Sequence, residues 1–211
     1  MKVHTIPSGM IQTNAYLLTD QEKGEAILID APGEIWAKIK PLLEEADLKL
    51  SALWITHGHW DHTQGGAEVV RETQAKVLAH DADRVLIETP EVMEGFMGEK
   101  LGLEGIQVDQ WVSQGDMLTQ FGEAVEVRHV PGHCPGNIMF VFPQANQAFV
   151  GDAIFAGSIG RTDLPGGSFE ELAKSIRQQI YTLSDSMVLL PGHGPTTQVG
   201  IEKQHNPHVP A

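Results

Sequence analysis

The chain has 211 residues, of which 41% are hydrophobic and 20% charged, a composition typical of a folded globular protein. Its 28 acidic side chains outnumber its 14 basic ones and give a net charge of −14, so a nucleic-acid backbone would be repelled and is not expected as a partner. No apolar run approaches the roughly 18 residues of a membrane-spanning helix, so a membrane is not expected as a partner either.

The chain is expected to be a cytoplasmic protein with a single domain over residues 1–211. Its first residues, MKVHTIPSGMIQTNAYLL, interleave polar and apolar side chains, whereas a signal peptide needs an uninterrupted apolar stretch. The single cysteine, Cys134, cannot form an internal disulfide, which agrees with a reducing compartment. The sequence does not indicate the oligomeric state.

The first third of the chain is predicted to form strands and one helix. Short segments rich in β-branched or aromatic residues, bounded by turn residues, predict strands over 2–6, 12–19 and 25–31. A helix is predicted over 34–48, where apolar residues recur at helical spacing. Pro41 lies within this segment and predicts that the helix is kinked or begins late.

The middle of the chain contains a buried strand, ALWIT (52–56), that runs into a crowded histidine segment. A helix over 67–75 and a strand over 76–80 are predicted to follow. The segment 89–105 is rich in Gly and Met without a clear period, and it predicts a surface loop with short helical pieces. A mobile flap is the alternative for this segment.

The second half is predicted to contain strands over 124–130, 137–142, 147–152 and 187–191. One helix has a clear start, because Ser168 and Glu171 form an S-x-x-E capping box. Its predicted apolar stripe consists of Phe169, Leu172, Ile176, Ile180 and Leu183.

The stretch HGHWDH places His57, His59, Asp61 and His62 within six positions after a buried strand. In an extended segment the two histidines that are two residues apart point the same way, and a tight turn would aim the other two side chains at the same point. Imidazole nitrogen and carboxylate oxygen suit zinc, iron or manganese. Solvated surface residues are the alternative, but four potential ligands so close together favour a metal site.

Three later segments each consist of an apolar strand that stops at a glycine and then presents one potential ligand: His133 in VPGHC, Asp152 in VGDA and His193 in PGHG. Asp152 alone is explained as an ordinary turn residue, and His193 alone as a loop histidine. Together with the four earlier residues they make seven ligands, too many for one ion. We therefore expect two divalent metal ions, with zinc as the first choice and iron or manganese as alternatives.

In this order and in these contexts, the seven residues resemble those of metallo-β-lactamase-fold hydrolases. More narrowly, the chain resembles the short glyoxalase II-like (hydroxyacylglutathione hydrolase-like) group. This resemblance lies in three segments, GDAIFAGSIGRTDLPGG and the closing PGHGPTT and EKQHNP. The resemblance implies an α+β fold, an αββα sandwich of two mixed β-sheets packed face to face with helices on both outer faces. The chain is expected to lack the C-terminal helical domain that supplies much of the glutathione pocket in full-length glyoxalase II.

The resemblance also implies how the ligands are shared. The first metal would be held by His57, His59 and His133, the second by Asp61, His62 and His193, and Asp152 would bridge them. Bound metals of this kind would lower the pKa of a water and so supply a hydroxide that could attack an acyl carbon near neutral pH. The implied reaction is hydrolysis of a small-molecule thioester such as S-D-lactoylglutathione, a glutathione conjugate, with Asp61 as the catalytic residue that orients the hydroxide.

Arg161 is the candidate for substrate binding, because an arginine fork suits the carboxylate of an anionic substrate. An internal salt bridge with Asp163 is the alternative. His80 and His129 lie near predicted strand ends and are interpreted as supports for the ligands or, more simply, as ordinary packed or solvent-facing histidines. Cys134 is interpreted as a small packing residue.

Other functions remain as alternatives. GRTD also resembles persulfide dioxygenases, which use one iron held by two histidines and a carboxylate, although LLPGHGP resembles the hydrolase group more closely. An RNA-processing nuclease of the same fold is disfavoured by the net charge of −14. A secreted lactamase is disfavoured because the first residues are not expected to form a signal peptide. The last alternative is a metal-binding protein without catalysis.

Overall fold

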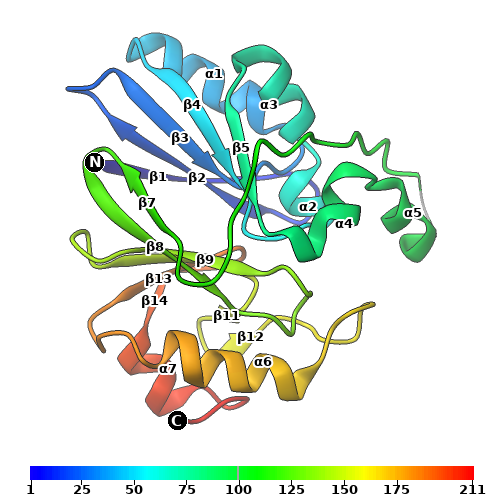
Figure 1. Cartoon of the computed structure of the whole chain (residues 1–211), viewed down its shortest axis with the longest axis vertical. Helices are drawn as coiled ribbons and strands as arrows, with labels where there is room; N and C mark the ends of the chain where they lie inside the picture. Colours follow the sequence, from blue (N-terminus) through cyan, green and yellow to red (C-terminus); the bar gives the residue numbers. More distant parts are fainter. Residues whose placement is uncertain (99) are drawn as a thin grey trace. The chain divides into compact units, whose positions relative to one another are not determined.

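A computed structural model of the chain describes residues 1–98 and 100–211, without the side chains of residues 96 and 97. The chain divides into two compact units, Met1–Trp111 and Val112–Ala211. Each unit contains a mixed six-stranded sheet with helices (Figure 1). The expectation of a single domain stays a prediction.

The sheet of the first unit has its strands in sequence order: β1 (Lys2–Ser8), β2 (Thr13–Asp20), β3 (Glu25–Ile29), β4 (Lys49–Trp54), β5 (Lys76–Ala79) and β6 (Gln110–Trp111). β1, β2 and β3 pair antiparallel, and β3 to β6 pair parallel. The helical segments of this unit are α1 (Ile35–Glu45), α2 (Trp60–Thr63), α3 (Gly66–Thr73), the 3₁₀ turn η1 (Asp81–Asp83), α4 (Arg84–Glu88) and α5 (Glu91–Met97).

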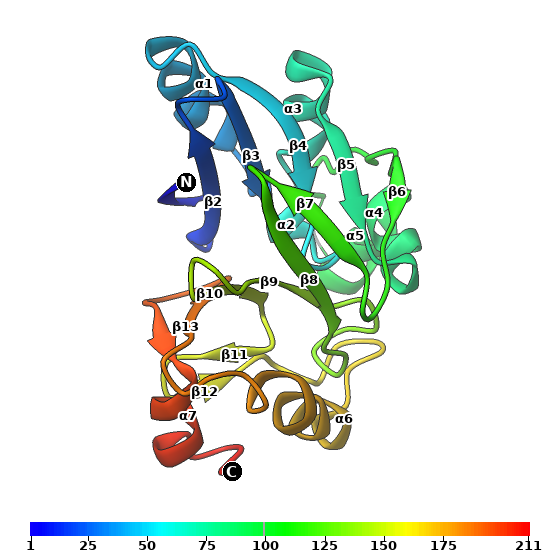
Figure 2. The same cartoon turned by 60° about the vertical axis from the view of Figure 1, so that its left-hand side comes forward.

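Helices α1 and α3 connect the parallel strands and lie side by side on one face of the sheet (Figures 1 and 2). They share a buried core in which Ile35 and Ile39 of α1 pack with Leu28 and Leu53 of the sheet. Helix α1 begins at Ile35 and runs through Pro41, so the alternative of a late start is wrong. Because β3, β4 and β5 are parallel, the segments that follow them emerge at one edge of the sheet.

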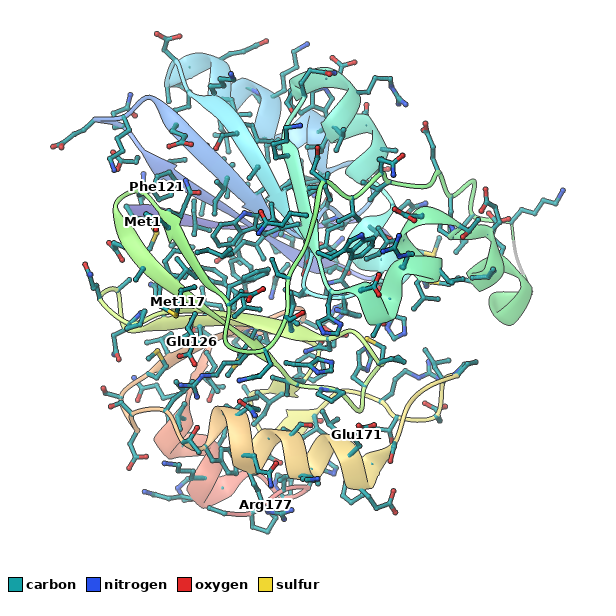
Figure 3. All side chains as sticks on the ribbon, in the orientation of Figure 1. Met1, Met117, Phe121, Glu126, Glu171 and Arg177 are labelled. Carbon is teal, nitrogen blue, oxygen red and sulfur yellow. The ribbon has the colours of Figure 1, made fainter. Side chains whose placement is uncertain are left out.

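The sheet of the second unit has the spatial order β14-β13-β10-β9-β8-β7. These strands are β7 (Met117–Gln120), β8 (Glu123–His129), β9 (Ile138–Phe142), β10 (Gln147–Gly151), β13 (Val188–Pro191) and β14 (Thr197–Gln198). Met117 of β7 lies opposite Glu126 of β8 (Figure 3). β10 and β13 are parallel, so the residues after both strands emerge at the same edge.

The rest of the second unit comprises a short hairpin and three helical segments. The hairpin is β11 (Ile154–Phe155) and β12 (Ser158–Ile159), and the helical segments are α6 (Phe169–Ser175), the π-helical turn η2 (Ile176–Ile180) and α7 (Val199–His205). Figure 3 labels Glu171 on α6 and Arg177 on η2. Leu172, Ile176 and Val199 belong to the buried core of this unit, together with side chains of β9 and β10.

The predicted start of α6 is confirmed, because Ser168 Oγ accepts the Glu171 N–H at 3.3 Å. In a full capping box the Glu171 side chain would accept the Ser168 N–H. Here the Ser168 N–H donates to the backbone oxygen of Gly132 at 2.8 Å instead. Phe169 is 45% exposed, and its assignment to the apolar stripe is wrong. Phe169 is the first residue of the helix, and the buried side chains of α6 begin one turn later, at Leu172.

The segment 89–105 contains α5 and a loop ordered by one carboxylate. Glu94 accepts the N–H groups of Leu101, Gly102 and Leu103, and these hydrogen bonds, the one from Leu103 foremost, lower the pKa of Glu94. The predicted short helical piece is confirmed, while Glu99 lies outside the described residues.

In the described part of the chain, every helix is too short or too polar to span a lipid bilayer.

Candidate metal centre

The loop after β4 carries four of the predicted ligands. The Ile55 N–H donates to Leu78 O at 2.9 Å and prolongs the pairing of β4 with β5. The chain stays extended at His59, whose backbone begins α2, and this short helix carries Asp61 and His62. A buried strand followed immediately by a tight helical turn therefore places all four side chains at the end of β4.

Within this unit the four side chains form one cluster. The ring of His57 lies with its centroid 4.0 Å from that of His62 and 4.9 Å from that of His59. His62 Nε2 lies 3.3 Å from Asp61 Oδ2. His57, Asp61 and His62 are buried, and a buried carboxylate beside imidazoles is a donor set that suits a divalent cation.

Asp30, at the end of β3, holds this cluster together and was not identified from the sequence. Its carboxylate is 2% exposed and accepts the Thr56 N–H at 2.8 Å, the Thr56 hydroxyl at 2.7 Å and His62 Nδ1 at 2.7 Å. Because a carboxylate accepts, the His62 proton resides on Nδ1, and Nε2 keeps its lone pair for a metal. The Thr56 hydroxyl oxygen in turn lies 3.1 Å from His57 Nδ1.

Two further contacts fix the same loop. The Thr13 hydroxyl, at the start of β2, donates to Asp61 Oδ2 at 2.7 Å. Buried Asp83 accepts the Gly58 N–H at 2.8 Å. A Cβ at Gly58 would lie 2.7 Å from Leu86 Cβ, so the chain between the first two histidines passes too close to its neighbour for a side chain.

The second unit brings the other three predicted ligands together. Asp152 follows β10, His193 follows β13, and His133 lies in the turn between β8 and β9. Asp152 Oδ2 lies 3.4 Å from His193 Nε2 and 3.7 Å from His133 Nε2. His133 and Asp152 are buried, whereas the His193 side chain is 26% exposed. The parallel pairing of β10 and β13 brings Asp152 and His193 to the same edge of the sheet.

The orientation of His133 is fixed by the backbone of the segment after β12. His133 Nδ1 lies 2.7 Å from the carbonyl oxygen of Arg161; a carbonyl only accepts, so Nδ1 carries the proton and Nε2 faces Asp152 with its lone pair. Gly160 makes this approach possible, because a Cβ there would lie 1.9 Å from Asp152 O and 2.9 Å from His133 Nδ1. Arg161 was predicted to act through its side chain, and this role of its backbone carbonyl has no signal in the sequence.

Asn137 is a second buried polar residue at the site that was not predicted from the sequence. Its Oδ1 accepts the Asp152 N–H at 3.3 Å, its Nδ2 donates to Val150 O at 3.4 Å, and its backbone oxygen accepts the Val130 N–H. Asn137 therefore ties the residue of the predicted bridging ligand to the strand that precedes it. Its only sequence signal is its position between a Pro/Gly turn and an apolar strand.

The remaining sequence candidates have structural partners. His80 Nδ1 accepts the Ala82 N–H at 3.2 Å and caps η1. His129 Nε2 lies 2.7 Å from Pro135 O, so His129 supports the turn that contains His133. Cys134 is fully buried, as expected of a packing residue.

The Arg161 side chain forms the ion pair that the sequence offered as the alternative. Its Nε and Nη2 donate to the two carboxylate oxygens of Asp163, both at 2.7 Å. Both side chains are more than half exposed. Arg161 lowers the pKa of Asp163 to about 2, so the pair is intact at neutral pH. Binding of substrate by Arg161 stays a prediction.

The donor set fits divalent metals. Groups of histidines and aspartates with suitable donor atoms include all seven predicted ligands: His57, His59, Asp61, His62, His133, Asp152 and His193. The fixed tautomers of His62 and His133 leave Nε2 available in both rings, as a metal ligand requires. The chemistry of these residues does not distinguish zinc from iron or manganese.

Residues 8–193 match the metallo-beta-lactamase superfamily. The chain belongs to this superfamily and has the metallo-β-lactamase fold, which confirms the predicted family and the α+β class. Over 99% of its length it is 38% identical to hydroxyacylglutathione hydrolase GloC of Haemophilus influenzae, covering 98% of that protein. These two matches confirm the prediction of a metallohydrolase related to the glyoxalase II-like group.

Several solved structures are similar to this chain. The B3 metallo-beta-lactamase BLEG-1 has a TM-score of 0.91 at 32% identity, with all of both chains covered. TTHA1623 in a di-iron-bound form has a TM-score of 0.85 at 33% identity, covering 97% of this chain and 99% of that one. ETHE1 from Myxococcus xanthus has a TM-score of 0.79 at 26% identity, covering 99% of this chain and 84% of that one.

Proposed function

We propose that this protein is a binuclear metallohydrolase that cleaves a small-molecule thioester such as S-D-lactoylglutathione. The observation that carries the proposal is the pair of ligand clusters whose imidazoles are held with Nδ1 protonated, His62 by Asp30 and His133 by the Arg161 carbonyl. Similarity to GloC over nearly the whole chain supports the acyl-glutathione class of substrate.

The seven residues are proposed to share two divalent ions. The first would be held by His57, His59 and His133 and the second by Asp61, His62 and His193, and Asp152 would contribute to both. Such ions lower the pKa of a bound water from about 15.7 to about 7 and polarise the carbonyl group that is attacked. Zinc is the first choice, and the di-iron form of the similar TTHA1623 supports iron as the alternative.

The protein's own residues orient the reactants. Asp61 is proposed to accept a hydrogen bond from the attacking water; the Thr13 hydroxyl, 2.7 Å from Oδ2, restricts the rotation of its carboxylate. Asp30 and the Arg161 carbonyl hold the imidazoles in the ligating tautomer. A thiolate is a good leaving group, so cleavage of a thioester requires less proton donation than cleavage of an amide would.

Metal analysis combined with a substrate panel tests the proposal. We expect the purified protein to contain close to two ions per chain and to hydrolyse S-D-lactoylglutathione, with activity lost on chelation and restored by metal. Oxygen consumption with glutathione persulfide would instead indicate a persulfide dioxygenase. Hydrolysis of a β-lactam without thioesterase activity would indicate a lactamase, and a metal-loaded protein inert toward all three would indicate a non-catalytic metal protein.

Arg161→Ala is expected to raise the KM for an anionic thioester severalfold and to leave the KM for a neutral thioester unchanged. Asp163→Asn provides the matched variant, because it removes the carboxylate that holds the guanidinium and is expected to lower the KM for the anionic substrate. Steady-state kinetics with both substrates measures the effect. An unchanged KM in both variants would remove Arg161 from substrate binding and leave it as a structural partner of Asp163.

A further inference from the structure

The EKQHNP segment, which the proposed function does not use, contributes a buried polar network to the second unit. Glu202 of α7 is 1% exposed and Asn206, at its end, is 2% exposed. A carboxylate so deeply buried costs free energy unless donors surround it. Glu202 has such donors in the β11–β12 hairpin, in β14 and at the end of its own helix.

The first donor is the tip of the β11–β12 hairpin. The Gly157 N–H lies 3.2 and 3.1 Å from the two oxygens of Glu202, and Gly157 has a positive φ of 69°, which favours glycine. Asn206 Nδ2 donates to the next carbonyl, Ser158 O, at 3.0 Å and also to Glu202 Oε2 at 2.8 Å. The two side chains therefore hold the hairpin turn from both its N–H and its C=O groups.

A third donor comes from β14. The Thr197 hydroxyl donates to Glu202 Oε1 at 2.6 Å. β14 pairs with β13, and the loop between these two strands carries His193. The Glu202 carboxylate consequently joins the hairpin tip to the strand that follows His193.

The base of the same hairpin lies among the proposed ligands. Asp152 precedes β11, and Arg161, whose carbonyl accepts the His133 Nδ1–H, follows β12. In the hairpin itself, the ring of Phe155 meets the ring of His193 edge-on, with centroids 6.0 Å apart. Movement of the hairpin would therefore displace groups next to each of the three ligands of this unit.

We propose that Glu202 and Asn206 are positioning residues that fix the β11–β12 hairpin and, through it, set the geometry of Asp152, His133 and His193. The inference rests on the proposed function, since it concerns the same ligands. Neither residue belongs to the proposed ligand set, and the hydrogen bonds described above reach the hairpin turn and β14.

Glu202→Gln tests the proposal with little change in volume. The amide nitrogen replaces one acceptor and faces N–H or O–H donors on either side. We expect amide hydrogen exchange in residues 152–161 of the metal-free protein to accelerate at least tenfold. We also expect the dissociation constant for the bound metals to rise about tenfold, the lower end of the range for outer partners of metal ligands, and the visible spectrum of the Co²⁺ form to change.

Tyr181→Phe is the matched control. The Tyr181 hydroxyl donates to Glu202 O at 3.2 Å and to Val209 O at 2.7 Å, so it holds the same helix by its backbone. Burial, with the nearby Glu202 charge, raises the pKa of Tyr181 to about 12, which keeps this donor protonated. We expect the control to lower the melting temperature without changing hairpin exchange, metal affinity or the Co²⁺ spectrum.

Thr197→Val replaces Glu202→Gln as the test if the Glu202 variant does not fold. It removes the hydroxyl that donates to Glu202 Oε1. We expect the same changes in hydrogen exchange, metal affinity and the Co²⁺ spectrum, each smaller than in Glu202→Gln. Wild-type behaviour of the hairpin and the metals in the folded Glu202 or Thr197 variants would overturn the inference, as would equal losses in Tyr181→Phe. If the wild-type protein bound no metal, the proposed function would fail, while hydrogen exchange would still decide whether Glu202 holds the hairpin.

Discussion

Replacing His59 by alanine is expected to abolish thioester cleavage and leave the protein folded. The side chain supplies one proposed ligand, and its loss should reduce kcat/KM by more than the 10–100-fold that follows loss of an outer partner of a metal ligand. The fold should survive, because His59 begins α2 through its backbone: its carbonyl accepts the His62 N–H at 2.9 Å and the Thr63 hydroxyl at 3.2 Å. Kinetics, metal analysis and thermal unfolding measure the three quantities.

His80→Ala is the control for His59→Ala. His80 lies at the end of the neighbouring strand, and its ring accepts one backbone N–H in the cap of η1. We expect this variant to retain full activity and its metal content. If His59→Ala cleaved the thioester at the wild-type rate, the assignment of the ligands would be wrong.

The ends of the buried strands were predictable because each strand is a continuous apolar run that stops at a turn residue. Segments 52–56, 147–152 and 187–191 were found in this way, within one to three residues of β4, β10 and β13. The polar groups that follow such strands stand out against the apolar background. The histidines and aspartates of the candidate site were conspicuous for this reason.

Elements without such a signal were not predictable. β11 and β12 have two residues each, too few for a period, and their turn is hydrogen-bonded to Glu202 and Asn206, which lie far away in the sequence. α7 follows a two-residue strand without a side-chain cap. Their positions depend on tertiary contacts that a local pattern does not contain.

Asp30 shows most clearly which features of the site can be predicted from the sequence and which cannot. Its local sequence, ILIDAPG, has the same form as the segments that present the ligands, an apolar strand followed by one polar residue. The sequence could mark it as a candidate but could not assign it a role, because its three donors come from Thr56 and His62 in another loop. Parallel pairing of β3 with β4 brings the two loops together.

Asp30→Asn is therefore the second substitution with a large expected effect. Asparagine has nearly the same shape and tolerates the positive φ of 60° found at this position, so the backbone should not change. Its amide nitrogen faces either the Thr56 N–H or His62 Nδ1–H. In the first case a buried donor is left unsatisfied, at a cost of about 1–3 kcal/mol in the free energy of unfolding.

In the second case the His62 proton moves to Nε2, and the ring can no longer present this nitrogen to a metal. Both cases lower stability or ligation, and we expect metal affinity to fall about 10–100-fold. Chelator competition measures the affinity, and ¹⁵N chemical shifts of the histidine rings report the tautomer in the metal-free protein.

Asp109→Asn is the control for Asp30→Asn, because Asp109 is also a carboxylate next to a strand and also accepts a backbone N–H. Asp109 accepts the Val77 N–H at 2.9 Å and pairs with Lys76 at 2.7 Å, and these two contacts, Lys76 first, lower its pKa. Its substitution should cost stability and leave metal affinity unchanged. Should Asp30→Asn bind metal as tightly as the wild type with the His62 tautomer preserved, the carboxylate would serve only the stability of the loop, and the orientation of His62 would have to come from its packing.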